Sequence, residues 1–353
     1  MPDNRPTHRS RRNRPRAHPS DRPPGLPGHR HGPDPHLAGH EVTGLDSGLF
    51  AECVLGSLDT PDVPGLSTDV RDVTVEQLTG FDAVVHMAAL SNDPLGSLAP
   101  EITYDINHHA STRLATLAKE AGVSRFVYAS TCSVYGAQSG DDLVDEDAPL
   151  KPVTPYAISK VRVEDDLAKL ADDHFVPVSM RNATAFGFSP RLRADIVLNN
   201  LVGRAVLTGK VTVLSDGTPW RPLAHAEDIA GAVVAALSAP ADVVRARAYN
   251  VGTEKNNRTV AEIAKAVVEA VPGSELEITG EAGNDPRSYR VDFARARKEL
   301  GFEAQWSIPD GPSSWPRSTP PAASPRRRST SASPASPSSP PARARASWTR
   351  RCA

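Results

Sequence analysis

A tyrosine and a lysine, Tyr156 and Lys160, stand four residues apart in the segment YAISK. On a helix this spacing places both side chains on one face. A lysine ammonium beside a phenol favours the phenolate, so the spacing predicts a lowered pKa for Tyr156 and a group that transfers protons near neutral pH. A surface tyrosine and lysine on an ordinary amphipathic helix would give the same pattern, and the spacing alone favours that simpler interpretation.

A hydroxyl-rich segment upstream reverses this judgement. Residues 126–136, FVYASTCSVYG, read as a buried strand whose end carries serine, threonine and cysteine. Thr131 stands at the end of this strand. Its hydroxyl can hydrogen-bond the same substrate oxygen that Tyr156 would serve. The two segments together indicate a proton-transfer set made of Thr131, Tyr156 and Lys160.

Strands alternate with helices through most of the chain. The apolar run at 81–90, FDAVVHMAAL, is typical of a parallel strand buried on both faces. The alternation predicts an α/β fold, a Rossmann-like doubly wound parallel sheet, with ligands at the carboxyl ends of its strands. Strands are expected at 40–46, 66–69, 81–90, 124–131, 176–186, 211–214, 248–252 and 274–280, and helices at 99–121, 156–173, 195–209, 226–240, 259–272 and 293–302.

The pattern divides the chain into four parts. Residues 41–186 are expected to form the sheet domain, and residues 187–311 a smaller C-terminal lobe that binds the substrate over the strand ends. Residues 1–40 show no apolar periodicity, and residues 312–353 are a low-complexity tail of proline, serine, arginine and alanine. These compositions predict disorder at both ends.

Charge and cysteine content exclude several classes of function. Residues 1–40 and 311–353 hold 8 arginines each, so the small overall charge of −2 hides an acidic middle. An acidic body is a poor nucleic-acid binder. The three cysteines, Cys53, Cys132 and Cys352, lack metal or disulfide spacing, so we expect no metal site and a reducing cytoplasm. No apolar run is long enough to span a membrane.

The motifs resemble the extended short-chain dehydrogenases/reductases of the NAD-dependent epimerase/dehydratase type, which act on nucleotide sugars. YAISK matches their YxxxK signature, and STCSVYG (130–136) matches a hydroxyl-rich strand followed by VYG. VVHMAA (84–89) matches the alanine-rich segment under the cofactor, and GTPWRPLAHAEDIA (217–230) resembles the arginine segment that contacts phosphate. The resemblance covers residues 41–310.

The resemblance implies NAD as cofactor and a role for each matching residue. Tyr156 would be the acid/base, Lys160 would lower its pKa and hold the nicotinamide ribose, and Thr131 would hydrogen-bond the oxygen being oxidised. Asp46 would accept hydrogen bonds from the adenosine ribose, which favours NAD over NADP because a 2′-phosphate would be repelled. The other implied cofactor contacts are Asp69 and Val70 beside the adenine, Ala88 and Ala89 under the cofactor, and the structural Asn107.

The implied substrate contacts are less regular. Arg221 and Arg287 are expected at the diphosphate, because a guanidinium matches phosphate oxygens, although either could be a surface ion pair. Ser91, Thr184 and Asn200 complete the implied set. Two departures from the family stand out. Cys132 and Ser133 replace the Asp-Glu pair of the 4,6-dehydratases, which argues against dehydration, and Thr184 stands where 4-epimerases have an asparagine.

The largest departure is at the front, where the family has a strand and a GxxGxxG turn that holds the pyrophosphate. Nothing in residues 1–40 resembles that turn. Reading Asp21–His36 one nucleotide later allows the translation TGHRGYLGTGTVLTPI, which contains the motif at the right distance. Residues 312–319 reframe to ELLAEVY, a plausible helix. We therefore hypothesise two frameshifts in the gene. If the displayed chain is what is made, it lacks the first strand and the glycine loop.

The leading interpretation is an NAD-dependent epimerase or oxidoreductase acting on a nucleotide sugar. A non-catalytic NAD-binding protein of the same fold and an inactive frameshifted product are the alternatives. The resemblance also implies a homodimer formed through the helices at 99–121 and 156–173.

Overall fold

The computed structural model describes residues 39–50, 53, 63–138, 143–189, 191–281 and 287–314. The predicted disorder at 1–40 and 312–353 falls almost entirely outside these residues and stays a prediction. In the part of the chain that is described, no helix combines the length and apolarity needed to cross a bilayer.

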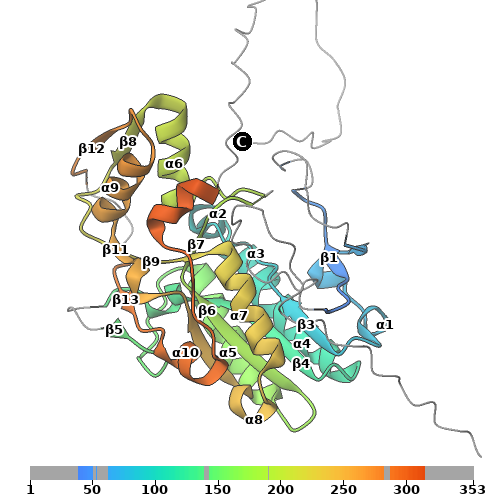
Figure 1. The fold of residues 1–353 in the computed structure, drawn as a ribbon. Coiled ribbons are helices and arrows are strands. Elements are labelled where there is room, and N and C mark those ends of the chain that lie inside the picture. The colour runs from blue at the N-terminus through green and yellow to red at the C-terminus, as the bar shows by residue number, and fades with distance from the viewer. Residues whose placement is uncertain are drawn as a thin grey trace, which may run out of the picture. The chain divides into compact units, whose positions relative to one another are not determined.

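A parallel four-stranded sheet forms the centre of the fold, in the order β10-β6-β4-β3. The strands are β3 (Ala83–His86), β4 (Arg125–Thr131), β6 (Val176–Asn182) and β10 (Arg247–Val251). Non-consecutive strands lie side by side because helices cross between them, as the alternating pattern predicts. The α/β fold with a parallel sheet is therefore confirmed (Figure 1).

Successive side chains of β4 point to opposite faces of the sheet, and helices cover each face. Phe126 and Tyr128 pack in a cluster with Leu114 of α4 (Ala110–Glu120) and Val163 of α5 (Pro155–Leu170). Val127 packs in another cluster, against α7 (Ala226–Ser238). Coverage of both faces is what defines a doubly wound sheet.

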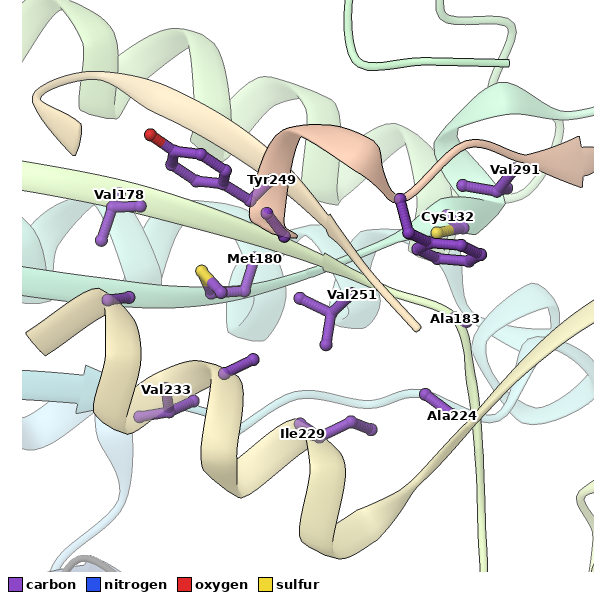
Figure 2. Close-up of a cluster of buried hydrophobic side chains, with 14 of the residues drawn as sticks. Cys132, Val178, Met180, Ala183, Ala224, Ile229, Val233, Tyr249, Val251 and Val291 are labelled. Atoms are coloured by element: carbon purple, nitrogen blue, oxygen red, sulfur yellow. The ribbon is translucent and has the colours of Figure 1, made fainter. Parts of the chain in front are cut away.

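Figure 2 shows the second of these clusters. Val178 and Met180 of β6 and Val251 of β10 lie above the helix that carries Ile229 and Val233. Cys132 also lies in this cluster and is buried. The carboxyl end of β4 is thus fixed by a continuous apolar core directly behind it.

Two short parallel strands, β1 (Gly44–Asp46) and β2 (Gly65–Ser67), form a separate pair. Among the described residues β1 bonds only to β2 and β3 bonds only to β4, so the two sheets are not joined by a ladder. Val85 of β3 and Met87 directly after it are 39% and 58% exposed. Of the described strands, none pairs with the other edge of β3, so that edge has room for a further strand.

The C-terminal part builds two smaller sheets beside the central one, β11-β9-β7 and β12-β8. Helices α6 and α9 pack with β8 around a third core cluster that includes Leu201, Val211 and Ile263. The strands are β7 (Thr184–Phe186), β8 (Lys210–Val213), β9 (Trp220–His225), β11 (Asn257–Thr259) and β12 (Glu275–Ile278), and the helices α6 (Val197–Thr208) and α9 (Val260–Ala270). Two short strands, β13 (Arg290–Val291) and β5 (Leu143–Val144), pair in parallel and so connect this part with the first half of the chain.

The remaining helices are short, namely α1 (Val75–Leu78), α2 (Asp93–Leu98), α3 (Pro100–Tyr104), α8 (Ala241–Val244) and α10 (Ala294–Leu300).

Three predicted elements differ in detail. The strand expected at 81–90 is only β3, because the chain leaves the sheet after His86. The strand expected at 176–186 is two strands, since Ala183 stands between β6 and β7, which belong to different sheets. The helix expected at 99–121 is α3, a π-helical turn over Asp105–His109, and α4. π-helical turns often occur at functional sites, and this one carries Asn107.

Candidate active site

Tyr156 and Lys160 lie in the first turns of α5. The helix begins at Pro155 because Thr154 caps it, with its hydroxyl accepting a hydrogen bond from the Ala157 N–H at 3.2 Å. Proline is favoured at this position, where no N–H is needed. The i,i+4 spacing therefore falls on a helix, as predicted, and the Lys160 ammonium lies 5.6 Å from the centre of the Tyr156 ring.

Lys160 is buried and points beneath the end of β4. Its ammonium donates a hydrogen bond to the Ala129 carbonyl at 2.6 Å and lies 4.6 Å from the centre of the Tyr128 ring. Burial lowers the pKa of Lys160 to about 7, while the charge of Glu164, one turn further along α5, opposes this change. Near neutral pH the amine can therefore gain or lose a proton at little cost.

The predicted effect of Lys160 on Tyr156 is not found. The pKa of Tyr156 is raised to about 12, chiefly by burial. The negative charge of Asp93 adds to this, and the charges of Arg193 and Arg287 and a hydrogen bond with Thr131 oppose it. The expectation of a lowered pKa considered the neighbouring cation and not the burial, which is the larger effect here.

Thr131 is the last residue of β4 and is buried. Its hydroxyl oxygen accepts a hydrogen bond from the Ser133 N–H at 3.1 Å, at the start of a 3₁₀ turn over Cys132–Tyr135. The same hydroxyl hydrogen-bonds Tyr156. The structure therefore brings together the three side chains that the sequence predicted as a set.

Gly136 ends this turn, and its backbone conformation explains why the VYG segment has a glycine there. Its φ is +64°, and a Cβ built there would lie 1.9 Å from the Lys151 carbonyl oxygen. Gly136→Ala should therefore lower the free energy of unfolding by about 2–4 kcal/mol, from left-handed backbone strain and a clash with backbone. Urea denaturation measures this. Gly122→Ala is the control, with φ +83° and no atom within 4 Å. An equal loss in both variants would contradict the role given to the clash.

The buried amine of Lys160 should make stability depend on pH. Between the folded pKa of about 7 and the ordinary value of 10.5 the unfolded chain holds a proton that the folded chain does not. Raising the pH through this window therefore favours the folded state. Lys160→Met should remove this part of the rise in unfolding free energy between pH 7 and pH 9. Urea titrations at both pH values test this, and an identical pH dependence in both proteins would contradict it.

The predicted cofactor residues follow the strands at their carboxyl ends. Asp46 ends β1, and its carboxylate accepts a hydrogen bond from the Gly48 N–H at 2.7 Å. Asp69 follows β2 and is held by Arg71, whose guanidinium and N–H both donate to it and lower its pKa. Val70 is buried beside it.

Ala88 and Ala89 follow β3, and Asn107 holds the next residue of that loop. The Asn107 side chain accepts a hydrogen bond from the Leu90 N–H at 2.7 Å and donates one to the Leu90 carbonyl at 2.9 Å. Asn107 is buried, so these two bonds fix the path of the chain after β3. This is the contact expected of a structural asparagine.

The predicted substrate residues divide into two groups. Ser91 and Arg287 lie on the polar network around Tyr156, where Arg287 pairs with Asp93 at 2.7 Å. Arg221 of β9 donates to the Arg287 carbonyl. The other two lie apart from these contacts. Thr184 pairs with Leu223 in the β7–β9 ladder, and Asn200 is exposed on α6 and donates to the Ala194 carbonyl at 3.1 Å.

Sequence reasoning missed two residues of the site. Arg193 donates a hydrogen bond to the Ser91 hydroxyl at 2.6 Å, and Asp93 joins Arg287 to α2. Both act on the pKa of Tyr156. Asp93, Tyr156 and Arg193 lie far apart in the sequence, and no spacing rule connects them. The only available signal was the repetition of arginine in SPRLRAD (189–195).

Comparison with known proteins decides the family. The profile of the "NAD dependent epimerase/dehydratase family" matches residues 36–252. The chain belongs to this family. The UDP-glucose 4-epimerase of Bacillus subtilis is 32% identical over 310 residues, covering 76% of this chain and 90% of the relative. The low-salt glycan biosynthesis protein Agl12 of Haloferax volcanii is 30% identical over 278 residues, covering 76% and 87%.

Solved structures of the epimerase/dehydratase family share the fold. MoeE5 in complex with UDP-glucose and NAD superposes with a TM-score of 0.68 at 26% identity, covering 79% of this chain and 90% of that one. The dTDP-glucose 4,6-dehydratase DesIV of Streptomyces venezuelae, with NAD bound, has a TM-score of 0.67 at 24% identity, covering 78% and 88%. The family is NAD-dependent, which agrees with the cofactor implied by the motifs.

The residues present fit NAD at its two ends. At the nicotinamide end Tyr156 and Lys160 would contact the ribose, and at the adenosine end Asp46 and Asp69 offer carboxylate acceptors next to strand ends. The described residues contain no glycine-rich turn between a strand and a helix that would hold the pyrophosphate between them. The described residues therefore offer polar groups for the two nucleosides but no glycine-rich turn for the phosphates.

Proposed function

We propose that this fold catalyses epimerisation or oxidation of a nucleotide sugar, with Tyr156 as acid/base. The observation that carries the proposal is the meeting of Thr131, Tyr156 and Lys160 at the carboxyl end of β4. Thr131 comes from β4 and the other two side chains from α5, and their convergence at the edge where such sheets bind ligands supports a catalytic rather than a structural role.

NAD, when bound, supplies the acceptor for the hydride that leaves the sugar carbon. Tyr156 would take the proton of the hydroxyl on that carbon, and Thr131 would orient the hydroxyl oxygen through a hydrogen bond. In an epimerase the keto sugar would turn over within the site, and Tyr156 would then return the proton to the same oxygen. The raised pKa favours the neutral phenol of Tyr156, which is the form that returns a proton. The charges of Arg193 and Arg287 favour the phenolate, which is the form that accepts one.

The residues after Thr131 support epimerisation or oxidation over dehydration. Cys132 is buried, donates to the Arg181 carbonyl at 3.0 Å, and has a pKa raised by burial. Ser133 carries no ionisable group in the relevant range. Neither side chain can eliminate water by acid/base chemistry, so a 4,6-dehydratase is disfavoured.

The activity is tested by incubating the purified chain with NAD and UDP- or dTDP-hexoses, followed by chromatography of the sugars. Interconversion of epimers without net NADH supports an epimerase, and NADH formed in proportion to product supports a dehydrogenase. Binding of NAD without any turnover of any hexose would favour a non-catalytic protein of this fold. Absence of both NAD and sugar binding would reject the proposal.

We also propose that the gene originally encoded a strand and glycine turn where residues 21–36 now stand. Among the described residues β3 pairs along one edge only and β1 and β2 form a separate sheet, which supports this, because one additional strand would join the two sheets. A version carrying TGHRGYLGTGTVLTPI at 21–36 should bind NAD at least tenfold more tightly than the displayed chain. Equal affinity, or resequencing that returns the displayed frame, would count against the idea.

A dimer through α4 and α5 is likewise a proposal from the family resemblance. Sedimentation of the purified chain measures it directly, and a monomer at high micromolar concentration would reject it.

A further inference from the structure

Each of the last three residues of β4 is bonded to α5. The α5 side chains that make these contacts stand four residues apart and so share one face of the helix. They are Tyr156, Lys160 and Glu164. The bonds of Tyr156 to Thr131 and of Lys160 to the Ala129 carbonyl belong to the site described above. The third bond, from the Ser130 hydroxyl to the Glu164 carboxylate at 2.5 Å, has no place in the chemistry given so far.

Glu164 is held in place from the neighbouring strand. Arg181 of β6 donates to its carboxylate from Nη2 at 2.7 Å and from Nε at 3.1 Å. Two bonds to a planar guanidinium fix the orientation of a carboxylate. Ser130 stands opposite Arg181 in the β4–β6 ladder. Glu164 therefore offers the Ser130 hydroxyl an acceptor whose position is fixed.

The chain that follows Thr131 is held by the same guanidinium. Arg181 Nη1 donates to the Tyr135 hydroxyl at 3.2 Å, and Tyr135 donates to Asn250 of β10 at 2.7 Å. Tyr135 is the last residue of the 3₁₀ turn that begins directly after Thr131. Thr131 therefore lies between two anchored neighbours, with Ser130 before it and this turn after it.

Ser130 itself is turned away from the reacting groups. Successive side chains of a strand point to opposite faces of the sheet, so the Ser130 and Thr131 hydroxyls lie on opposite faces. Ser130 is only 3% exposed, and its hydroxyl is bonded to Glu164. Any influence of Ser130 on the reaction therefore passes through the backbone to Thr131.

From these contacts we infer that Ser130 and Glu164 are positioning residues for the reaction at Tyr156. Their bond holds the end of β4 against α5 and so keeps the Thr131 hydroxyl within hydrogen-bond distance of the phenol. The inference rests on the proposed function and adds to it two side chains that set the geometry of the site. Displacement of a reacting group by about 1 Å can lower a rate by about 100-fold, so loss of a bond one residue from Thr131 should be visible in turnover.

The first test is Ser130→Ala, which removes this bond and leaves Glu164 paired with Arg181. We expect kcat for a nucleotide sugar at saturating NAD to fall by about 10–100-fold, while the KM for the sugar changes little. Ser111→Ala is the matched control. Ser111 is a buried serine of α4 whose hydroxyl shares a hydrogen bond with the His86 ring of β3 at 2.7 Å. Both variants lose one buried bond, so their stabilities should fall alike, but Ser111→Ala should keep its kcat.

The second measurement needs neither NAD nor a substrate. NMR of the full chain with labelled tyrosine gives the Cζ chemical shift of Tyr156, which responds to hydrogen bonding of its hydroxyl, and Tyr156→Phe assigns the signal. Thr131→Val shows how far the signal moves when the bond to Thr131 is lost. Ser130→Ala should move the signal in the same direction, and Ser111→Ala should leave it in place.

The outcomes separate the two ideas. If the unmodified chain turns over no hexose, the proposed function falls and the inference with it. If the unmodified chain is active and Ser130→Ala keeps its kcat or leaves the Tyr156 signal unmoved, the inference alone is rejected. A fall in kcat of the same size in Ser111→Ala would show that the loss is not particular to the end of β4, and it would also overturn the inference.

Discussion

Tyr156→Phe should lower the turnover of a nucleotide sugar by about 10²–10⁴-fold, the usual worth of a positioned acid/base group. The substitution removes the hydroxyl that Thr131 binds and keeps the ring that packs near Lys160. Binding of UDP should change little, because the phenol lies at the reacting end of the sugar. Turnover is measured by chromatography of the sugars at saturating NAD, and UDP affinity by calorimetry.

Tyr104→Phe is the matched control. Tyr104 ends α3, its ring stacks under the Arg162 guanidinium, and a phenylalanine ring keeps that contact. This variant should retain full turnover. Unchanged turnover in Tyr156→Phe, or an equal loss in both variants, would refute the acid/base role of Tyr156.

Arg181→Met should lower the free energy of unfolding by about 3–5 kcal/mol, the range for breaking a buried ion pair from one side. The side chains of Arg181 and Glu164 are only 7% and 10% exposed, and Arg181 Nη2 and Nε donate to the Glu164 carboxylate at 2.7 and 3.1 Å. The same guanidinium donates to the Glu146 carbonyl at 3.0 Å. Glu164 also accepts from Ser130, so among the described residues its carboxylate would be left with one neutral hydrogen-bond donor.

Two further variants test whether the loss comes from the stranded charge of Glu164. Arg247→Met breaks an exposed pair with Glu299 and should cost no more than about 1 kcal/mol. The double variant Arg181→Met/Glu164→Leu removes the stranded charge, so it should be more stable than Arg181→Met alone. Urea denaturation of all four proteins measures these differences. A double variant less stable than Arg181→Met would show that the pair stabilises the fold by other means.

The parts of the site that were predictable from sequence depend on local spacing. Tyr156, Lys160 and Thr131 belong to a helix start and a strand end, and both elements have strong sequence patterns. The position of Asn107 was predictable from the family motif, whereas its two bonds to Leu90 depend on a π-helical turn that no pattern announces. The alternation of apolar runs was enough to predict the parallel sheet.

The rest could not be predicted because it depends on burial and on distant segments. The pKa of Tyr156 moves upward because burial outweighs the neighbouring charges, and burial is a property of the finished fold. Arg193 lies on the loop after β7 and meets Ser91, which follows β3, only when the chain has folded. The break of the predicted 176–186 strand at Ala183 likewise follows from packing between two sheets.

The separation of the β1–β2 pair from β3 has a consequence for the energetics of cofactor binding. A two-stranded pair is marginally stable by itself, and four of its six residues are exposed, namely Asp46 and all three residues of β2. We expect its amide protons to exchange with solvent at a far lower opening free energy than those of β4 and β6. Any ligand held by Asp46 must first hold that pair in place. The affinity for adenosine would then reflect the contact free energy minus this ordering cost, while the proton transfer proposed for Tyr156 would not depend on it.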